Sequence, residues 1–141
     1  MKPIFMLAAG LALSFSASAV SADEKLPKEL ICAPVEISKC NSAEGCVKIS
    51  RTAPNSPTFL KIDLDDKKVA FRRFDGSYGY QNIDGQKRLK KQLLLHGIVD
   101  ASERSPDGYV WSMSITNEGR MALSVSAPEV VYAVTGNCEA L

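Results

Sequence analysis

Apolar and polar residues alternate most clearly over positions 109–125, which read YVWSMSITNEGRMALSV. The apolar side of this alternation consists of Tyr109, Trp111, Met113, Ile115, Met121, Leu123 and Val125. A period of two is typical of a half-buried β-strand, and Asn117, Glu118 and Gly119 interrupt it with residues that favour a turn. The segment therefore predicts a β-hairpin with one apolar and one polar face.

A second hairpin is predicted over TFLKIDLDDKKVAFRRF, residues 58–74, with its turn at Asp65–Lys67. Its alternating apolar positions are Leu60, Ile62, Leu64, Val69 and Phe71. Nearer the N-terminus, Ile31, Ala33, Val35 and Ile37 alternate with Cys32, Pro34, Glu36 and Ser38. Because proline has no amide hydrogen to donate, Pro34 predicts an unpaired side or a β-bulge in this strand.

Further short strands are predicted in CVKIS, residues 46–50, and in EVVYAVTGNC, residues 129–138. Residues 92–99, QLLLHGIV, are interpreted as a strand, whereas residues 86–91 fit either a short helix or an extended segment. The pattern amounts to roughly seven to nine short strands joined by tight turns. We therefore expect an all-β fold, a small antiparallel meander closed into a barrel of lipocalin-like size or into a closed sandwich.

Residues 1–22 have the features of a cleaved signal peptide. Lys2 precedes a short apolar run from Ile4 to Phe15, the small residues Val20, Ser21 and Ala22 offer a cleavage site, and charged residues follow. The apolar run is too short to span a bilayer. We expect residues 23–141 to form a single β-barrel-like domain that is periplasmic or secreted.

The four cysteines, Cys32, Cys40, Cys46 and Cys138, form an even set behind a signal sequence, which predicts disulfides. A zinc site is disfavoured because no close C-x-x-C pair occurs. Cys40 and Cys46 flank a turn-forming NSAEG run, which leaves Cys32 to pair with Cys138 and tie the first strand to the last. In the loop-entropy model the long bridge stabilises by about 4–5 kcal/mol and the short one by about 2–3 kcal/mol.

The charge balance excludes general nucleic-acid binding. Without Lys2 the mature chain has sixteen basic and sixteen acidic residues, so it lacks the basic excess that binds nucleic acids or anionic membranes. No second apolar segment is long enough to span a membrane after signal cleavage.

No residue pattern predicts a catalytic, metal or cofactor site. His96 is the only histidine, its neighbours supply no nucleophile or orienting carboxylate, and it is interpreted as a surface residue. Asp63, Asp65 and Asp66 are followed by two lysines where a calcium loop would need glycine, so they are assigned to a charged turn. We therefore expect a non-enzymatic protein, with a hydrolase of unrecognised site as the second alternative.

The segment RRFDGSYGY, residues 72–80, is the candidate partner surface. It combines Arg72, Arg73, Phe74, Tyr78 and Tyr80, and tyrosine and arginine are common among interface hot spots. We expect it to form a loop and the protein to act on another envelope or secreted protein, as an inhibitor or accessory subunit.

The apolar face of the hairpin at 109–125 is expected to cover a filled core, with Arg73 and Thr135 as the polar residues on the inner face. The alternative is a carrier of a small apolar ligand. The expected architecture is similar to that of lipocalins, although their Gly-x-Trp signature is absent from the first strand, LICAPVEIS. It is also similar in size, signal and cysteine usage to small periplasmic barrels that inhibit lysozymes or proteases, without matching their motifs. Architecture alone does not determine function.

Overall fold

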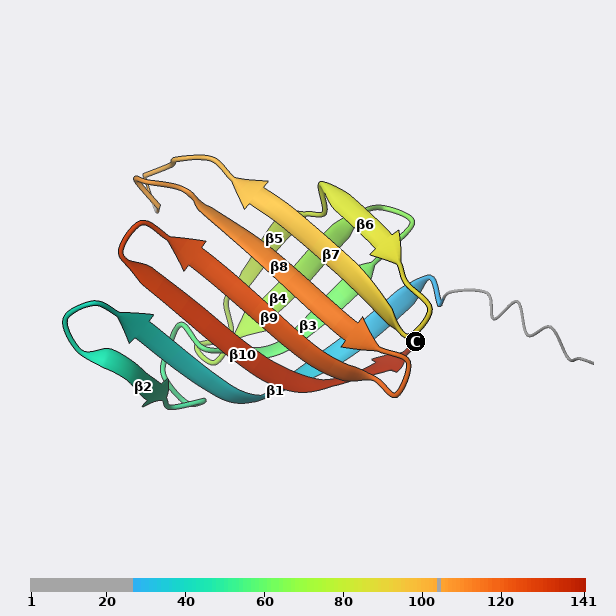
Figure 1. Cartoon of the computed structure of the whole chain (residues 1–141), viewed down its shortest axis with the longest axis horizontal. Coiled ribbons are helices and arrows are strands. Elements are labelled where there is room, and N and C mark those ends of the chain that lie inside the picture. The colour runs from blue at the N-terminus through green and yellow to red at the C-terminus, as the bar shows by residue number, and fades with distance from the viewer. Residues whose placement is uncertain (1–26, 104) are drawn as a thin grey trace, which may run out of the picture.

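The computed structural model describes residues 27–103 and 105–141, so the predicted signal peptide lies outside the described residues. All regular elements of the described chain are β-strands (Figure 1). They are β1 (Glu29–Asn41), β2 (Gly45–Ile49), β3 (Pro57–Asp63), β4 (Lys68–Arg73), β5 (Tyr78–Asn82), β6 (Gly85–Arg88), β7 (Gln92–Val99), β8 (Tyr109–Thr116), β9 (Arg120–Ala127) and β10 (Val130–Ala140). The predicted all-β class is therefore confirmed.

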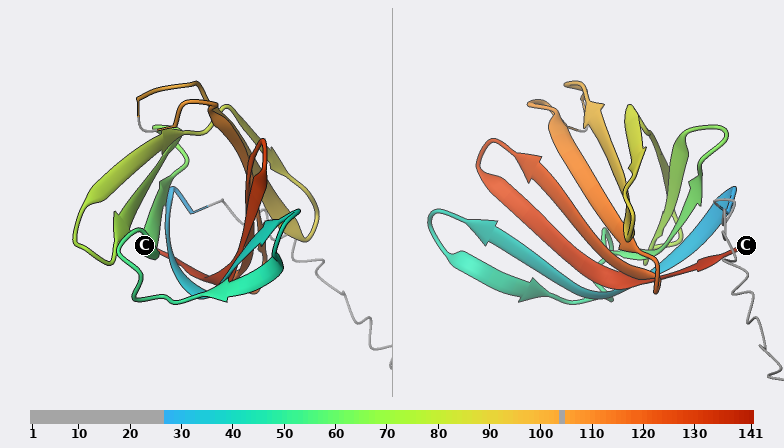
Figure 2. Two further views of the ribbon diagram at one scale, coloured as in Figure 1. Left: turned by 90° about the vertical axis from the view of Figure 1, so that its left-hand side faces the viewer. Right: turned by 45° about the vertical axis from the view of Figure 1, so that its right-hand side comes forward.

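One antiparallel sheet contains all ten strands and curls into a half-barrel (Figure 2). The strand order is β5-β4-β3-β1-β10-β9-β8-β7-β6, and β2 pairs with the second half of β1. The first and last strands are therefore neighbours in the middle of the sheet, and a series of hairpins extends from each. The end strands β5 and β6 follow each other in the chain, so the curl brings the two ends of the sheet together.

The corner between β5 and β6 is held by backbone hydrogen bonds on both sides. The Ile83 amide donates to the Lys67 carbonyl at 2.9 Å, and the Asp84 amide donates to the His96 carbonyl at 2.9 Å. The Asp84 carboxylate also accepts a hydrogen bond from the Ile98 amide at 2.6 Å. Ile83 itself is buried. The corner thus joins the turn between β3 and β4 to β7.

Two disulfides connect residues that lie directly opposite each other on paired strands. Cys32 of β1 bonds to Cys138 of β10, and Cys40 of β1 bonds to Cys46 of β2. The first is buried within the core, whereas Cys46 is exposed. The long bridge therefore lies at the junction between the two halves of the sheet.

A β-bulge in β1 changes which residues of the first strand face inward, compared with the prediction. The register against β10 shifts between Pro34 and Glu36, as the proline predicts. Before the bulge, Leu30, Cys32 and Pro34 are buried, whereas Val35 is exposed. The extra residue changes the phase of the alternation, so Ile37 points inward again. The prediction that Ile31, Ala33 and Val35 share a face with Ile37 was wrong because simple alternation does not continue through a bulge.

The two predicted hairpins and the ambiguous stretch are resolved as strands. Residues 109–127 form β8 and β9 around a turn at Asn117, and residues 57–73 form β3 and β4. The strand predicted over 92–99 coincides with β7, and β6 covers part of the segment that the sequence left open. The inner side of these strands carries the buried core: Leu60, Ile62, Val69, Leu93, Leu95, Trp111, Met113, Ile115 and Met121.

Large inward side chains repeatedly lie over a glycine on the neighbouring strand. Phe71 is opposite Gly79, and Trp111 is opposite Gly97. A Cβ atom at position 97 would lie 2.5 Å from Trp111 Nε1 and 2.5 Å from the Asn82 carbonyl oxygen. These glycines give the rings room to lie against the wall of the sheet.

We expect Gly97→Ala to lower the free energy of unfolding by about 1–3 kcal/mol, because the new methyl group meets backbone as well as the indole. Chemical denaturation measures this change. Gly85→Ala is the matched control, since the atoms nearest to its methyl group all belong to the ring of the exposed His96, which can rotate away. The free energy of unfolding of Gly85→Ala should stay within about 0.5 kcal/mol of the wild-type value. Equal costs for the two variants would contradict the assignment of Gly97 as a packing constraint.

Candidate functional site

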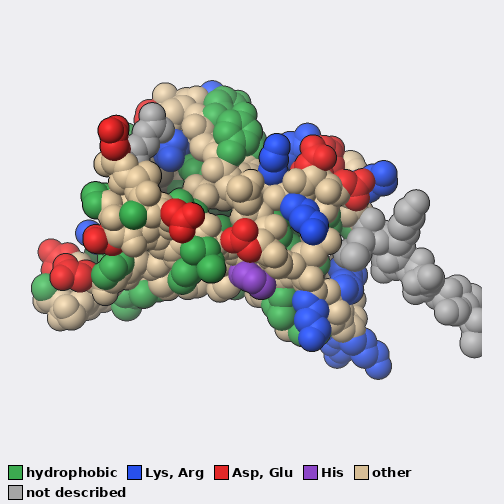
Figure 3. All heavy atoms as spheres, turned by 90° about the horizontal axis from the view of Figure 1, so that it is seen from above, with side chains coloured by type: hydrophobic (Ala, Val, Ile, Leu, Met, Phe, Trp, Pro, Cys, Tyr) green, Lys and Arg blue, Asp and Glu red, His purple; other side chains and the backbone are tan. Residues whose placement is uncertain are grey.

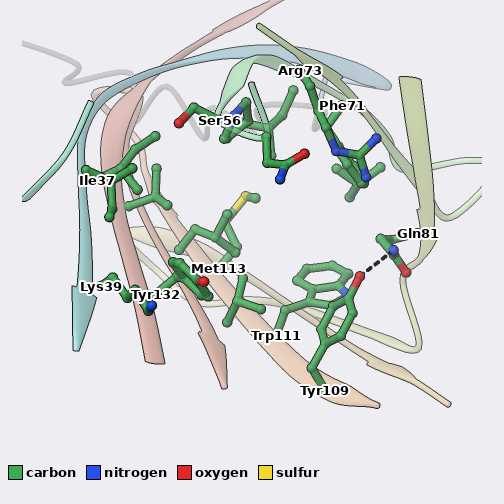
Figure 4. Close-up of a pocket in the computed structure, with 18 of the residues that line it drawn as sticks. Ile37, Lys39, Ser56, Phe71, Arg73, Gln81, Tyr109, Trp111, Met113 and Tyr132 are labelled. Atoms are coloured by element: carbon green, nitrogen blue, oxygen red, sulfur yellow. Dashed lines mark hydrogen bonds between the residues drawn. The ribbon is translucent and has the colours of Figure 1, made fainter. Parts of the chain in front are cut away.

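The inner face of the half-barrel carries an open cavity of about 470 Å³, so the expected filled core was wrong for this part of the molecule (Figure 4). Strands from both halves of the sheet line it, together with the segment between β2 and β3. The lining residues share an inward orientation and are mostly apolar: Ile37, Ile49, Leu60, Val69, Phe71, Tyr109, Trp111, Met113, Leu123, Val125, Tyr132 and Val134, with Lys39, Ala53, Asn55, Ser56, Pro57, Arg73 and Gln81. The volume is within the range of pockets that hold small molecules.

The segment between β2 and β3 lies at the cavity and is fixed by its own hydrogen bonds. Ser56 is buried, and its hydroxyl donates to the Ser50 carbonyl at 2.8 Å. The Ser56 amide donates to the Ala53 carbonyl at 2.9 Å, and the Ser56 carbonyl accepts from the Phe74 amide at 2.9 Å. Its polar groups are thus satisfied by neighbouring backbone, which ties this part of the lining to the β4–β5 hairpin.

Arg73, Gln81 and Tyr109 form what we call the polar wall of the cavity (Figure 4). Gln81 Nε2 donates a hydrogen bond to the Tyr109 hydroxyl oxygen at 2.6 Å. Burial raises the pKa of Tyr109 above its ordinary value of 10.0, and the nearby Arg73 charge and the Gln81 hydrogen bond oppose this shift. The phenol is therefore neutral near pH 7. Because its oxygen accepts from Gln81, its own hydrogen is left to donate elsewhere.

The Arg73 side chain is half-buried and packs on an aromatic ring. Its guanidinium carbon lies 4.8 Å from the centroid of the Phe71 ring, and Nη1 donates to the Ser77 hydroxyl at 3.2 Å. The sequence correctly predicts that Arg73 lies on the inner face. Thr135 is instead exposed, because Val134, Gly136 and Cys138 occupy the inward positions of β10.

Trp111 contributes a buried polar group to the cavity region. The side chain is 5% exposed, and its Nε1 has no hydrogen-bond partner among the described residues. A buried N–H without an acceptor is uncommon and unfavourable. The nitrogen lies over Gly97 of β7, where an added Cβ atom would come within 2.5 Å of it, so this edge of the indole faces the wall of the sheet.

The five residues of the predicted partner surface divide between the two faces of the β4–β5 hairpin. Arg73 points toward the cavity, whereas Arg72 and Tyr78 are directly opposite each other on the outer face. Phe74, Tyr78 and Tyr80 are 52%, 54% and 68% exposed. The segment expected to be a loop is mostly strand, with its turn between Arg73 and Tyr78.

The outer surface carries the remaining candidates. His96 is exposed on β7, as the sequence predicts, and charges of both signs are spread over the face in Figure 3. Among residues 27–103 and 105–141, no three His, Cys, Asp or Glu side chains are grouped to hold a metal ion. The described chain likewise contains no helix with the length and apolar character needed to cross a membrane.

Sequence reasoning missed Lys39, Gln81 and Tyr109 as polar groups of a cavity. Tyr109 stands in the predicted apolar face, and its position at the end of that alternation is the available signal. Gln81 lies two residues after Gly79 on β5, so both residues are on the inward side of that strand. Lys39 lies two residues after Ile37 on β1, so the alternation that places Ile37 on the inner face is the available signal for Lys39.

The comparisons with known proteins identify no relative whose site could be compared with this cavity. No protein-family model matches the chain, and the searches of curated proteins and of solved structures found no match either. The function must therefore be argued from the cavity and the surface themselves.

We expect the free energy of unfolding to fall as the pH rises above about 10 and to fall less steeply in Tyr109→Phe. The unfolded chain ionises this phenol near its ordinary pKa, whereas burial delays ionisation in the folded protein. The stabilisation is therefore fully present below the unfolded pKa and is lost as the pH rises through the folded value. Urea unfolding of both proteins between pH 8 and 11 measures the difference; parallel curves would contradict the burial of Tyr109.

Proposed function

We propose that the protein binds a small, largely apolar molecule in the cavity of the half-barrel. The observation that carries this proposal is the cavity of about 470 Å³, whose wall combines apolar side chains with a few convergent polar groups. Ligand sites are typically concave, mainly apolar and oriented by a small number of polar groups. We further propose that the protein works in the periplasm or outside the cell, since its two disulfides suit an oxidising environment.

The rings that line the cavity support binding rather than simple packing. Phe71 and Trp111 lie against glycines of neighbouring strands and therefore form walls instead of filling the interior. Apolar lining atoms of an open cavity stay exposed to water, which is unfavourable. A ligand that covers them removes this apolar surface from water, so occupancy stabilises the folded protein.

Trp111 is the only tryptophan of the chain and lines the cavity, so it reports directly on binding. The uncharged fluorophore N-phenyl-1-naphthylamine serves as the probe. We expect it to bind with 1:1 stoichiometry, to quench Trp111 by energy transfer, and to raise the melting temperature as its concentration increases.

Val125→Phe should reduce the affinity for this probe by at least about tenfold, because the larger side chain occupies space beside Trp111. Fluorescence titration measures the loss. Ala122→Phe places the same side chain at an exposed position of the same strand and serves as the control. Equal affinities for the wild type and Val125→Phe, or no probe binding to the folded wild type, would overturn the proposal.

A second candidate function is recognition of another envelope or secreted protein through the outer face of the β4–β5 hairpin. The exposure of Phe74, Tyr78 and Tyr80 favours it, because these rings contribute little to the core and remain available for contact. Arg72 lies beside Tyr78 on the same face. Aromatic rings next to arginine are typical of interface hot spots.

We expect a Tyr78→Ala, Tyr80→Ala double variant to keep nearly the wild-type melting temperature while no longer recovering a partner in an affinity pull-down from the native envelope. The reason is that both side chains are mostly exposed. Thermal denaturation and quantitative pull-down measure the two effects. Unchanged partner recovery would argue against this surface, and a large loss of stability would show that the rings support the fold.

A further inference from the structure

The charged residues that line the cavity are all basic. They are Lys39 and Arg73, and no aspartate or glutamate is among the residues that line it. The whole chain, by contrast, has seventeen basic and sixteen acidic residues. The cavity is therefore positively biased within a protein whose overall charge is almost balanced, which favours a negatively charged occupant.

Arg73 has no carboxylate partner among the described residues. Salt bridges in the described chain involve other cations, and the identified side-chain partner of Arg73 is the Ser77 hydroxyl. Asp75 is close in sequence, but its carboxylate accepts a hydrogen bond from the Ser77 amide at 2.8 Å. Hydrogen bonds from Ser77 hold the pKa of Asp75 below its ordinary value, with a smaller contribution from Arg73. A guanidinium has five N–H donors, so most of the hydrogen-bonding capacity of Arg73 remains for a ligand.

Tyr109 adds a neutral donor beside this cation. Its oxygen accepts from Gln81, which orients the ring and leaves the hydroxyl hydrogen for another acceptor. Figure 4 shows Arg73, Gln81 and Tyr109 along the same side of the cavity, with Trp111 next to Tyr109. A cation and a hydroxyl donor that converge above aromatic walls suit an oxyanion attached to an apolar body.

We propose that the ligand is an amphipathic organic anion. Its carboxylate or sulfonate head is held by Arg73 and Tyr109, and its apolar body packs between Phe71, Trp111 and Met113. This inference rests on the proposed function, since it names the chemical class of ligand for the same cavity. Arg73 then determines specificity for charged over neutral ligands of similar shape.

Two fluorescent probes that share the same aromatic body test the proposal. 1-Anilinonaphthalene-8-sulfonate carries a sulfonate, whereas N-phenyl-1-naphthylamine is its uncharged counterpart. We expect the wild-type protein to bind the sulfonate at least about tenfold more tightly than the neutral probe, because a charge-assisted hydrogen bond is lost with the neutral molecule. Dodecanoate should displace the sulfonate probe, whereas dodecanol at the same concentration should not.

Arg73→Gln should abolish the preference for the sulfonate, so that the two probes bind this variant with similar affinity. Arg72→Gln is the matched control, because Arg72 is the adjacent residue on the outer, exposed face of the same strand. Its preference should equal that of the wild type. If Arg73→Gln does not fold, as judged by near-ultraviolet circular dichroism, Arg73→Met removes the charge without introducing a half-buried amide and gives the same comparison.

The outcomes separate this inference from the proposed function. Binding of the neutral probe without any preference for the sulfonate, or a preference that persists in Arg73→Gln, overturns the anionic head group and leaves the cavity as a ligand site. Failure of both probes to bind the folded wild type overturns the proposed function as well. Stoichiometric binding to a protein with an unchanged near-ultraviolet spectrum excludes nonspecific binding to a partly unfolded state.

Discussion

The pairing of the first strand with the last is the constraint on which the rest of the structure depends. β1 and β10 lie side by side at the middle of the sheet, and Cys32 and Cys138, directly opposite each other, are joined by a buried disulfide. One series of hairpins extends from β1 to β5 and the other from β10 to β6. Because β5 continues directly into β6, both series must end at the same corner. A shift in the central register would displace the two halves and separate the groups that meet at Ile83 and Asp84.

Alternation of apolar and polar residues predicts much of this architecture and fails at identifiable points. It predicts the hairpins at β3–β4 and β8–β9 and the strand at 92–99, whereas the expected Cys32–Cys138 bridge predicts that the first and last strands are neighbours. It fails around Val35, where a bulge changes the phase of β1. It also fails at Thr135, because Val134 and Gly136 on either side of it occupy the inward positions of β10. Periodicity states which side chains share a face, but a bulge or a register determines which face is inside.

The cavity could not be predicted from the same pattern, because alternation does not report whether the inward side chains fill the enclosed volume. Apolar residues at the inner positions are equally compatible with a solid core and with a lined pocket. The difference arises from cross-strand pairing: Phe71 faces Gly79 and Trp111 faces Gly97, so both rings lie close to the sheet. Those pairs depend on the three-dimensional register. The positions of Gln81 and Tyr109 beside each other also require the curl that brings β5 near β8.

We interpret the polar wall as part of the proposed ligand site rather than as a contribution to stability. The half-buried guanidinium of Arg73 loses hydration without gaining a salt bridge among the described residues, and the buried indole N–H of Trp111, which has no acceptor there, is unfavourable in the same way. A charged group such as Arg73, which opposes folding and lines a cavity, is expected where an external molecule completes its interactions. The ligand that we propose would offset this cost, because its head group accepts hydrogen bonds from Arg73 and Tyr109 and its apolar body packs against Trp111.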